Sequence, residues 1–196
     1  MFRATSMLLK RMLHQKEINA FIESHRYLEC LEFNDAVLEH FNFSFQVSSK
    51  DRVHIPDQNR VLIVANHPLS SLDGLALLKL ISEIRSDVKI VATTLLNCID
   101  PLQSLFLSVN NLSKSACHRN SMNQIAAALE SEQAVILLST GEISRISPLG
   151  VRDGKWKTGF LSLAKRTRFP LYRCSLAAKT RHCFMVCRRF TNPWEP

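Results

Sequence analysis

Residues 61–74 read VLIVANHPLSSLDG, and they decide the fold because they join a buried strand to a helix. The run 61–65 is short, apolar and rich in β-branched side chains, which predicts a buried strand. Pro68 prevents a simple continuation of this strand, or of a helix, through the turn. Leucines and isoleucines at helical spacing then predict a helix over 72–86, with Asp73 in its first turn as a candidate N-terminal cap.

His67 and Asp73 stand on either side of this turn. A carboxylate at the start of a helix can turn back to a histidine at the end of the preceding strand, where it fixes the imidazole tautomer and stabilises the imidazolium. His67 would then take a proton from a substrate hydroxyl group. In the alternative interpretation, His67 is a turn histidine and Asp73 is only a cap, and the pair alone does not decide between the two.

Further strand patterns follow, separated by helical ones. Apolar runs predict strands over 88–92 and 134–138, and another strand begins at residues 170–171. Strand–helix–strand units at this spacing are typical of parallel crossovers. We therefore expect an α/β fold with a mostly parallel central sheet flanked by helices.

The remaining segments support this sheet. Apolar and polar residues alternate over 41–47, which predicts a strand with one wet face, at the edge of the sheet. A polar loop is expected over 51–59. Apolar residues at helical spacing predict the other helices, over residues 18–28, 34–41, 102–109, 121–129 and 156–166.

Length and charge limit the function classes. The 196 residues suffice for one domain with a real core, and the net charge of +8 suits an anionic membrane surface, an acidic protein or nucleic acid. No RNA-binding or zinc-finger motif supports nucleic acid, and no apolar run has the roughly 18 residues of a membrane-spanning helix. Residues 1–16 place basic side chains beside apolar ones, the pattern of a helix that lies in a membrane interface, and the alternative is a frayed terminus or a helix packed on the domain.

The cysteines do not indicate a metal site. They form no C-x-x-C pair and follow no signal peptide, so reduced cytosolic thiols are expected. His182, Cys183 and Cys187 are close in sequence, but their spacing fits no common zinc site. The six cysteines are Cys30, Cys98, Cys117, Cys174, Cys183 and Cys187.

The string Asn66-His67-Pro68 followed by Asp73-Gly74 resembles the first motif of the PlsC-like glycerolipid acyltransferases. It is most similar to the hemolysin-like, lyso-ornithine-lipid branch, in which five residues rather than the commoner four separate His from Asp. The resemblance implies that His67 is the general base and Asp73 its partner. It also implies that Asn66 belongs to the substrate-binding residues.

A second group of residues follows the strand over 134–138. Gly141, Glu142, Ser144 and Arg145 match the third motif of the same family, whose residues help to bind the polar head of the acceptor. Leu138-Ser139 departs from the usual Phe-Pro of that motif, so the loop lacks its proline. The family's second motif is not clear, and Arg119 is the candidate for its arginine. The later pattern from Gly150 to Phe160 is typical of the same branch.

The resemblance implies an acyltransferase that moves a fatty acyl group from acyl-CoA or acyl carrier protein to the hydroxyl of a lysolipid. The acceptor would be of the 1-acylglycerol-3-phosphate or lyso-ornithine-lipid type, and no cofactor or metal is required. We expect the acyl carrier protein or CoA thioester, the lysolipid and an anionic membrane surface as partners, and no nucleic acid. The protein would be cytoplasmic and peripheral on the inner face of the membrane.

The resemblance covers residues 17–170, the expected acyltransferase domain, and stops at the tail over 171–196. The tail is rich in Cys and Arg, shows no clean period and lacks the continuation of the family. Shifted by one base within the Leu171 codon, ordinary codons for the tail can spell a sequence similar to that continuation. We therefore expect a frameshifted or truncated tail and an incomplete C-terminal part. The alternative to an active enzyme is a catalytically inactive remnant at the membrane surface.

Overall fold

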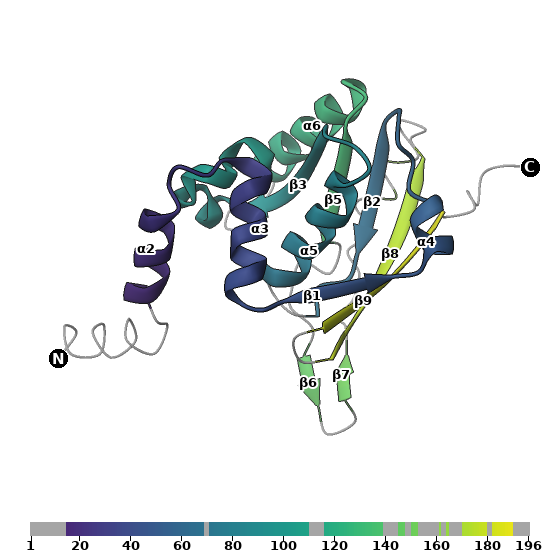
Figure 1. Cartoon of the computed structure of the whole chain (residues 1–196). Coiled ribbons are helices and arrows are strands. Elements are labelled where there is room, and N and C mark those ends of the chain that lie inside the picture. Colours follow the sequence, from purple (N-terminus) through teal and green to yellow (C-terminus); the bar gives the residue numbers. More distant parts are fainter. Residues whose placement is uncertain are drawn as a thin grey trace, which may run out of the picture.

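The computed structural model describes residues 15–68, 71–109, 116–138, 145–147, 150–152, 161, 164, 170–179 and 182–189. A seven-stranded sheet with helices on both faces forms its centre (Figure 1). β2, β5, β3, β4 and β8 run parallel to one another, whereas β9 is antiparallel to β8 and parallel to β1. The expected α/β fold with a mostly parallel sheet is confirmed. In spatial order the strands are β1 (Ser44–Val47), β9 (His182–Arg189), β8 (Leu171–Lys179), β2 (Val61–Ala65), β5 (Ala134–Leu138), β3 (Val88–Thr93) and β4 (Phe106–Val109).

β2 is the middle strand, and all five of its residues are buried. Because side chains alternate along a strand, Val61, Ile63 and Ala65 pack into one core and Leu62 and Val64 into another. This double burial explains why the strand is apolar throughout rather than alternating.

The helices divide between the two faces. Residues of α3 (Cys30–His40) and α5 (Ser71–Ser82) pack in the core of Ile63, and residues of α6 (Ala116–Glu130) pack in the core of Leu62. In Figure 1, α3 and α5 lie in front of the sheet. Within the described residues, no helix is long and apolar enough to cross a membrane. The shorter or peripheral elements are α2 (Gln15–Ser24), α4 (Ser49–Val53), the 3₁₀ helices η1 (Thr94–Cys98) and η2 (Asp100–Leu105), and the hairpin of β6 (Arg145–Ser147) and β7 (Gly150–Arg152).

Most expected elements are present, and two were wrong. Residues 106–109 form strand β4 rather than the end of a helix, because they pair with β3 at the edge of the sheet. The expected loop over 51–59 begins inside α4, which Ser48 caps by accepting a hydrogen bond from the Asp51 amide. β1 is an edge strand, as predicted. The segment 1–14 and most of 156–166 lie outside the described residues.

The described residues of the tail, 171–179 and 182–189, form a pair of sheet strands, which corrects the expectation that the tail has no period. In β9, Cys183, Met185 and Cys187 are buried, and Phe184 and Val186 between them are exposed. This alternation places three side chains in the core beneath α3 and α5. The backbone of β8 and β9 thus completes the sheet between β2 and β1. A change of reading frame is not tested by these contacts and stays a prediction.

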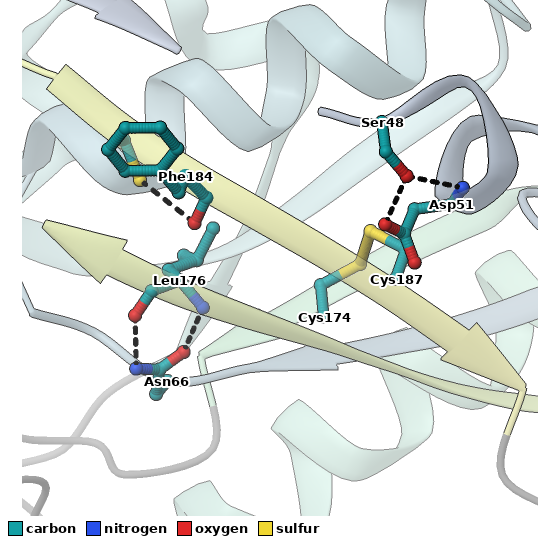
Figure 2. The surroundings of a disulfide bond; sticks show 8 residues. Ser48, Asp51, Asn66, Cys174, Leu176, Phe184 and Cys187 are labelled. Atoms are coloured by element: carbon teal, nitrogen blue, oxygen red, sulfur yellow. Dashed lines mark hydrogen bonds between the residues drawn. A yellow bond between two sulfur atoms is a disulfide. The ribbon is translucent and has the colours of Figure 1, made fainter. Parts of the chain in front are cut away.

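Two cysteines of this hairpin also correct the expectation of reduced thiols. Cys174 and Cys187 are directly opposite in the antiparallel pairing of β8 and β9, and they form a disulfide (Figure 2). Cys30, Cys98 and Cys183 are not disulfide-bonded. The sequence offered no C-x-x-C pair because the bridging residues are brought together by the hairpin and not by local spacing.

Arg85 fastens the amino ends of the central strands. Its guanidinium donates to both carboxylate oxygens of Asp87, at 2.7 and 2.8 Å. It also donates to the carbonyl oxygens of Pro56, Asn59 and Glu132, in the loops before β2 and β5. This hydrogen bonding to Arg85 holds the pKa of Asp87 below its ordinary value, against the opposing effect of burial. Arg85 is 6% exposed, so these contacts satisfy a buried cation.

Candidate active site

The candidate site lies where β2 ends and α5 begins. Asn66 and His67 follow the last residue of β2, and Pro68 turns the chain away from the sheet. Asp73 is the third residue of α5, within its first turn. The predicted strand–turn–helix is therefore present, with the three polar residues at the carboxyl end of a parallel strand, the usual place for ligand sites in α/β sheets.

His67 and Asp73 form a hydrogen-bonded pair. The ring nitrogen Nδ1 of His67 lies 2.7 Å from Oδ1 of Asp73. Asp73 is fully buried, and the His67 side chain is 18% exposed. An ionised carboxylate only accepts, so in a neutral imidazole this contact places the proton on Nδ1 and the lone pair on Nε2. Within the described part of the chain, Nε2 has no hydrogen-bond partner.

The backbone of α5 holds the buried carboxylate in place. The same Oδ1 of Asp73 accepts a hydrogen bond of 2.7 Å from the Gly74 amide, at the positive end of the helix. Gly74 also lets this turn approach the sheet closely. A Cβ atom there would lie 3.3 Å from the Ile90 side chain and 3.4 Å from that of Leu138. Asp73 is thus hydrogen-bonded both to the amide of its own helix and to His67.

Asn66 makes contacts that the sequence did not reveal. Its Nδ2 donates to the Leu176 carbonyl oxygen at 2.8 Å, and its Oδ1 accepts from the Leu176 amide at 2.6 Å (Figure 2). The side chain is 7% exposed. Its predicted part in binding substrate is not tested by these contacts, but its two polar atoms are both engaged with β8. The position of an amide residue directly after a buried strand was the signal in the sequence. The sequence did not show that the partner of this amide is Leu176.

Cys183 of β9 is close enough to the site to interact with Asp73. Burial, and secondly the negative charge of Asp73, raise the pKa of the Cys183 thiol to about 12. The thiol therefore stays neutral and adds no charge beside the carboxylate. No sequence pattern pointed to Cys183 as a neighbour, because 110 residues separate it from Asp73.

The structure does not bring all the predicted residues together. Gly141, Glu142 and Ser144 lie outside the described residues. Arg145 is the first residue of β6 and lies opposite Arg152 of β7. Figure 1 shows this hairpin beyond the end of the sheet toward which β2 points, the same end as His67. Arg119 lies in the first turn of α6.

The other candidate features lie elsewhere. Among the described residues, no three His, Cys, Asp or Glu side chains are grouped to hold a metal ion. A cavity of about 600 Å³ lies between the α2–α3 junction and η2, lined by residues that include Arg26, Glu29 and Asp100. None of the predicted site residues lines it, so it is separate from the His67–Asp73 pair.

Comparison with known proteins gives a family match over most of the chain. A family model described as Acyltransferase matches residues 3–174, a range that ends within β8. This range contains the His67–Asp73 pair and the whole second group of predicted site residues.

Two curated relatives are both named lyso-glycine lipid O-acyltransferase. The protein of Bacteroides thetaiotaomicron is 27% identical over 168 residues, which is 84% of this chain and 60% of the relative. The protein of Phocaeicola vulgatus is 24% identical over 160 residues, 81% of this chain and 56% of the relative. The chain thus spans less than two thirds of the length of these relatives.

A solved structure has the same fold. The 1-acyl-sn-glycerophosphate acyltransferase PlsC of Thermotoga maritima superposes with a TM-score of 0.59 at 17% identity. The superposition covers 98% of this chain and 79% of the PlsC chain.

Proposed function

This chain belongs to the PlsC-like acyltransferase family, and we propose that it transfers a fatty acyl group from a thioester to the hydroxyl group of a lysolipid. The observation that carries the proposal is the 2.7 Å contact between His67 Nδ1 and the buried Asp73 carboxylate. The name that the two curated relatives share supports a lysolipid as the acceptor.

The chemistry follows from the protonation of the pair. Nε2 of His67 removes the proton from the acceptor hydroxyl, and the resulting oxygen attacks the carbonyl carbon of the thioester. The carbon–sulfur bond breaks, and the leaving thiolate takes the proton from Nε2. Asp73 holds the ring and stabilises its positive charge between the two proton transfers. The acyl group passes directly to the acceptor, so no Ser or Cys nucleophile is needed.

The acceptor head is proposed to bind near the β6–β7 hairpin. Gly141, Glu142, Ser144 and Arg145 match the family's third motif, and Arg119 is proposed as a further contact. Arg145 and Arg152 are opposite each other in the pairing, so this short hairpin carries two cationic residues at one level. Arginine suits carboxylate and phosphate groups because its guanidinium binds both with paired hydrogen bonds.

The proposal also covers the acyl donor and the position of the protein at the membrane. The donor is acyl carrier protein or acyl-CoA, and no cofactor or metal takes part. The net charge of +8 suits an acidic carrier protein and an anionic membrane surface, and we propose a peripheral position on the inner face of the membrane.

The test is acyl transfer from labelled acyl-CoA and acyl carrier protein to a panel of lyso-glycine lipid, lyso-ornithine lipid and lysophosphatidate. His67→Ala is expected to lose transfer by at least about 100-fold, the usual contribution of a general base. His54→Ala is the matched control, because this exposed histidine follows α4, its ring bonds the Lys50 carbonyl oxygen of that helix, and the variant is expected to retain activity. Folded wild-type protein that acylates no acceptor would support the inactive remnant instead.

A further inference from the structure

Asn66 links the candidate site to the C-terminal hairpin of β8 and β9. Both ends of its side-chain amide bond one residue, Leu176, 110 positions later in the chain. Both bonds go to the backbone, so they do not depend on the side chain at 176. Figure 2 shows the amide reaching from the end of β2 to the neighbouring strand.

The amide replaces the next step of the parallel ladder. The pairing of β2 with β8 ends at Ala65 and Cys174, because the chain then turns away through His67 and Pro68. The amide and carbonyl of Leu176, which its own strand directs toward β2, would otherwise lose their partners. A carboxamide is suited to this place because it has one donor end and one acceptor end. Aspartate lacks the donor, and leaving a buried backbone group unpaired is costly.

The position of this link matters for His67. Asn66 is the last residue attached to the sheet before the turn, and His67 is the next residue in the chain. Asp73 is held separately, by the first turn of α5 and the Gly74 amide. The 2.7 Å contact therefore needs two anchors, one on each side of the turn.

We propose that Asn66 is a positioning residue, whose amide fixes the end of β2 to β8 and thereby places His67 against Asp73. This inference rests on the proposed acyl transfer. The hairpin of β8 and β9 becomes part of the support of the site, through the backbone at Leu176.

A second feature of the hairpin agrees with this. Cys183 of β9 is fully buried, in the same core as residues of α5, the helix that carries Asp73. The hairpin thus bonds the residue before His67 through Leu176 and also packs in the core beneath α5.

The test compares variants at Asn66 and at Arg85 with the wild type. Asn66→Ala removes both hydrogen bonds, and Asn66→Ser keeps one small polar group and replaces Asn66→Ala if that protein does not fold. Arg85→Met is the matched control, since the buried Arg85 side chain also bonds backbone carbonyl groups but at the opposite end of β2. Thermal unfolding, kcat, KM for the lysolipid and the ring ¹⁵N shifts of His67 are measured for each, with His67→Ala to assign the ring.

We expect Asn66→Ala to lower kcat about tenfold to 100-fold with little change in KM, the usual effect of a misplaced catalytic group. The His67 ring should change from the Nδ1–H form to a mixture of tautomers. Arg85→Met should lose stability but keep kcat and the Nδ1–H form. A raised KM with unchanged kcat in Asn66→Ala would overturn the proposal in favour of substrate binding. A His67 tautomer and a kcat that change no more in Asn66→Ala than in Arg85→Met would also overturn it.

The ring signal separates this inference from the proposed function. If the wild type transfers no acyl group to any acceptor, the proposed function fails. The tautomer of His67 still reports whether Asn66 places the ring against Asp73. A wild-type ring without the Nδ1–H form would overturn the positioning role directly.

Discussion

The two ends of β2 use buried polar groups in opposite ways. At the amino end, Arg85 is 6% exposed and spends its donors on Asp87 and three backbone carbonyls. At the carboxyl end, Asn66 and Asp73 are equally buried, but they hold a histidine whose Nε2 has no partner among the described residues. In the first arrangement every donor of the guanidinium is paired, so it is the closed end, whereas in the second, one ring nitrogen is unpaired among the described residues.

Because of this difference, the residues that stabilise the fold can be distinguished from the residues of the candidate site on a single strand. Buried polar groups that satisfy one another stabilise a fold or specify it, whereas a site needs one group left to react. Changes at the amino end should therefore alter unfolding, and changes at the carboxyl end should alter the rate of transfer. Each prediction below tests that division.

Asp73→Asn should have the largest effect. The amide no longer stabilises the imidazolium and can hold the wrong ring tautomer, so we expect kcat to fall by about 100-fold to 10,000-fold. The transfer assay measures this effect, and the ring ¹⁵N shifts of His67 report the tautomer. Activity within about threefold of the wild type would mean that Asp73 serves only the start of α5.

Arg85→Met should lower the stability of the fold and leave the rate of transfer nearly unchanged. Removing the guanidinium leaves three carbonyls and Asp87 without their donor, and we expect a loss of about 3 kcal/mol in the free energy of unfolding. The rate of transfer per folded molecule should stay within about twofold. Urea unfolding and the assay at matched folded concentration measure both quantities. A large loss of rate would show that the two ends are coupled through β2.

The sequence predicted the part of the site that is local. The order of β2, turn and α5 follows from periodicity, and His67 and Asp73 are six residues apart, so their contact was within reach of a pattern. The contact of Asn66 with Leu176 was not, because it depends on which strand lies beside β2. Strand order is set by the packing of the whole sheet, and no residue near Asn66 encodes it.

The strand period of β9 in the tail was missed for a related reason. Cys183, Met185 and Cys187 alternate with Phe184 and Val186, so the side chains of both sets are apolar and the period of two is hidden. Only burial distinguishes the two sets. Residues 106–109 were misread because four apolar or small residues fit a helix as well as an edge strand.

Reduction of the Cys174–Cys187 disulfide should have a moderate effect. The bridge spans 13 positions, and a loop of this size stabilises a fold by about 3 kcal/mol in the chain-entropy description. We expect reduced wild type to unfold at lower urea concentration than oxidised protein. Because Asn66 bonds the backbone of β8, transfer should fall less than in Asn66→Ala.

The matched control for the disulfide is the double variant Cys174→Ala with Cys187→Ala, whose unfolding should not respond to reductant. Equal unfolding of oxidised and reduced wild type would contradict a stabilising bridge. A loss of transfer as large as in Asn66→Ala would show that the bridge, and not the amide, places the end of β2.

The smallest effect is expected at Asp87 and depends on pH. The pKa of this carboxyl is lowered in the folded protein, chiefly by its hydrogen bonds to Arg85, from an ordinary value of 3.8. A lowered folded pKa means that the contribution to stability is complete above the unfolded pKa and is lost as the pH falls through the folded value. Asp87→Asn should therefore unfold more easily than the wild type at pH 6, and this gap should close toward pH 3.

Urea unfolding at several pH values measures that gap, with Asp57→Asn as the control. Asp57 is exposed, and its substitution should produce no gap at any pH. Transfer per folded molecule by Asp87→Asn at neutral pH should equal that of the wild type, because this carboxylate acts only at the closed end of β2. A gap that persists unchanged to pH 3 would mean that the Asp87 charge is not what Arg85 stabilises, and that the amino end is held by the carbonyl contacts alone.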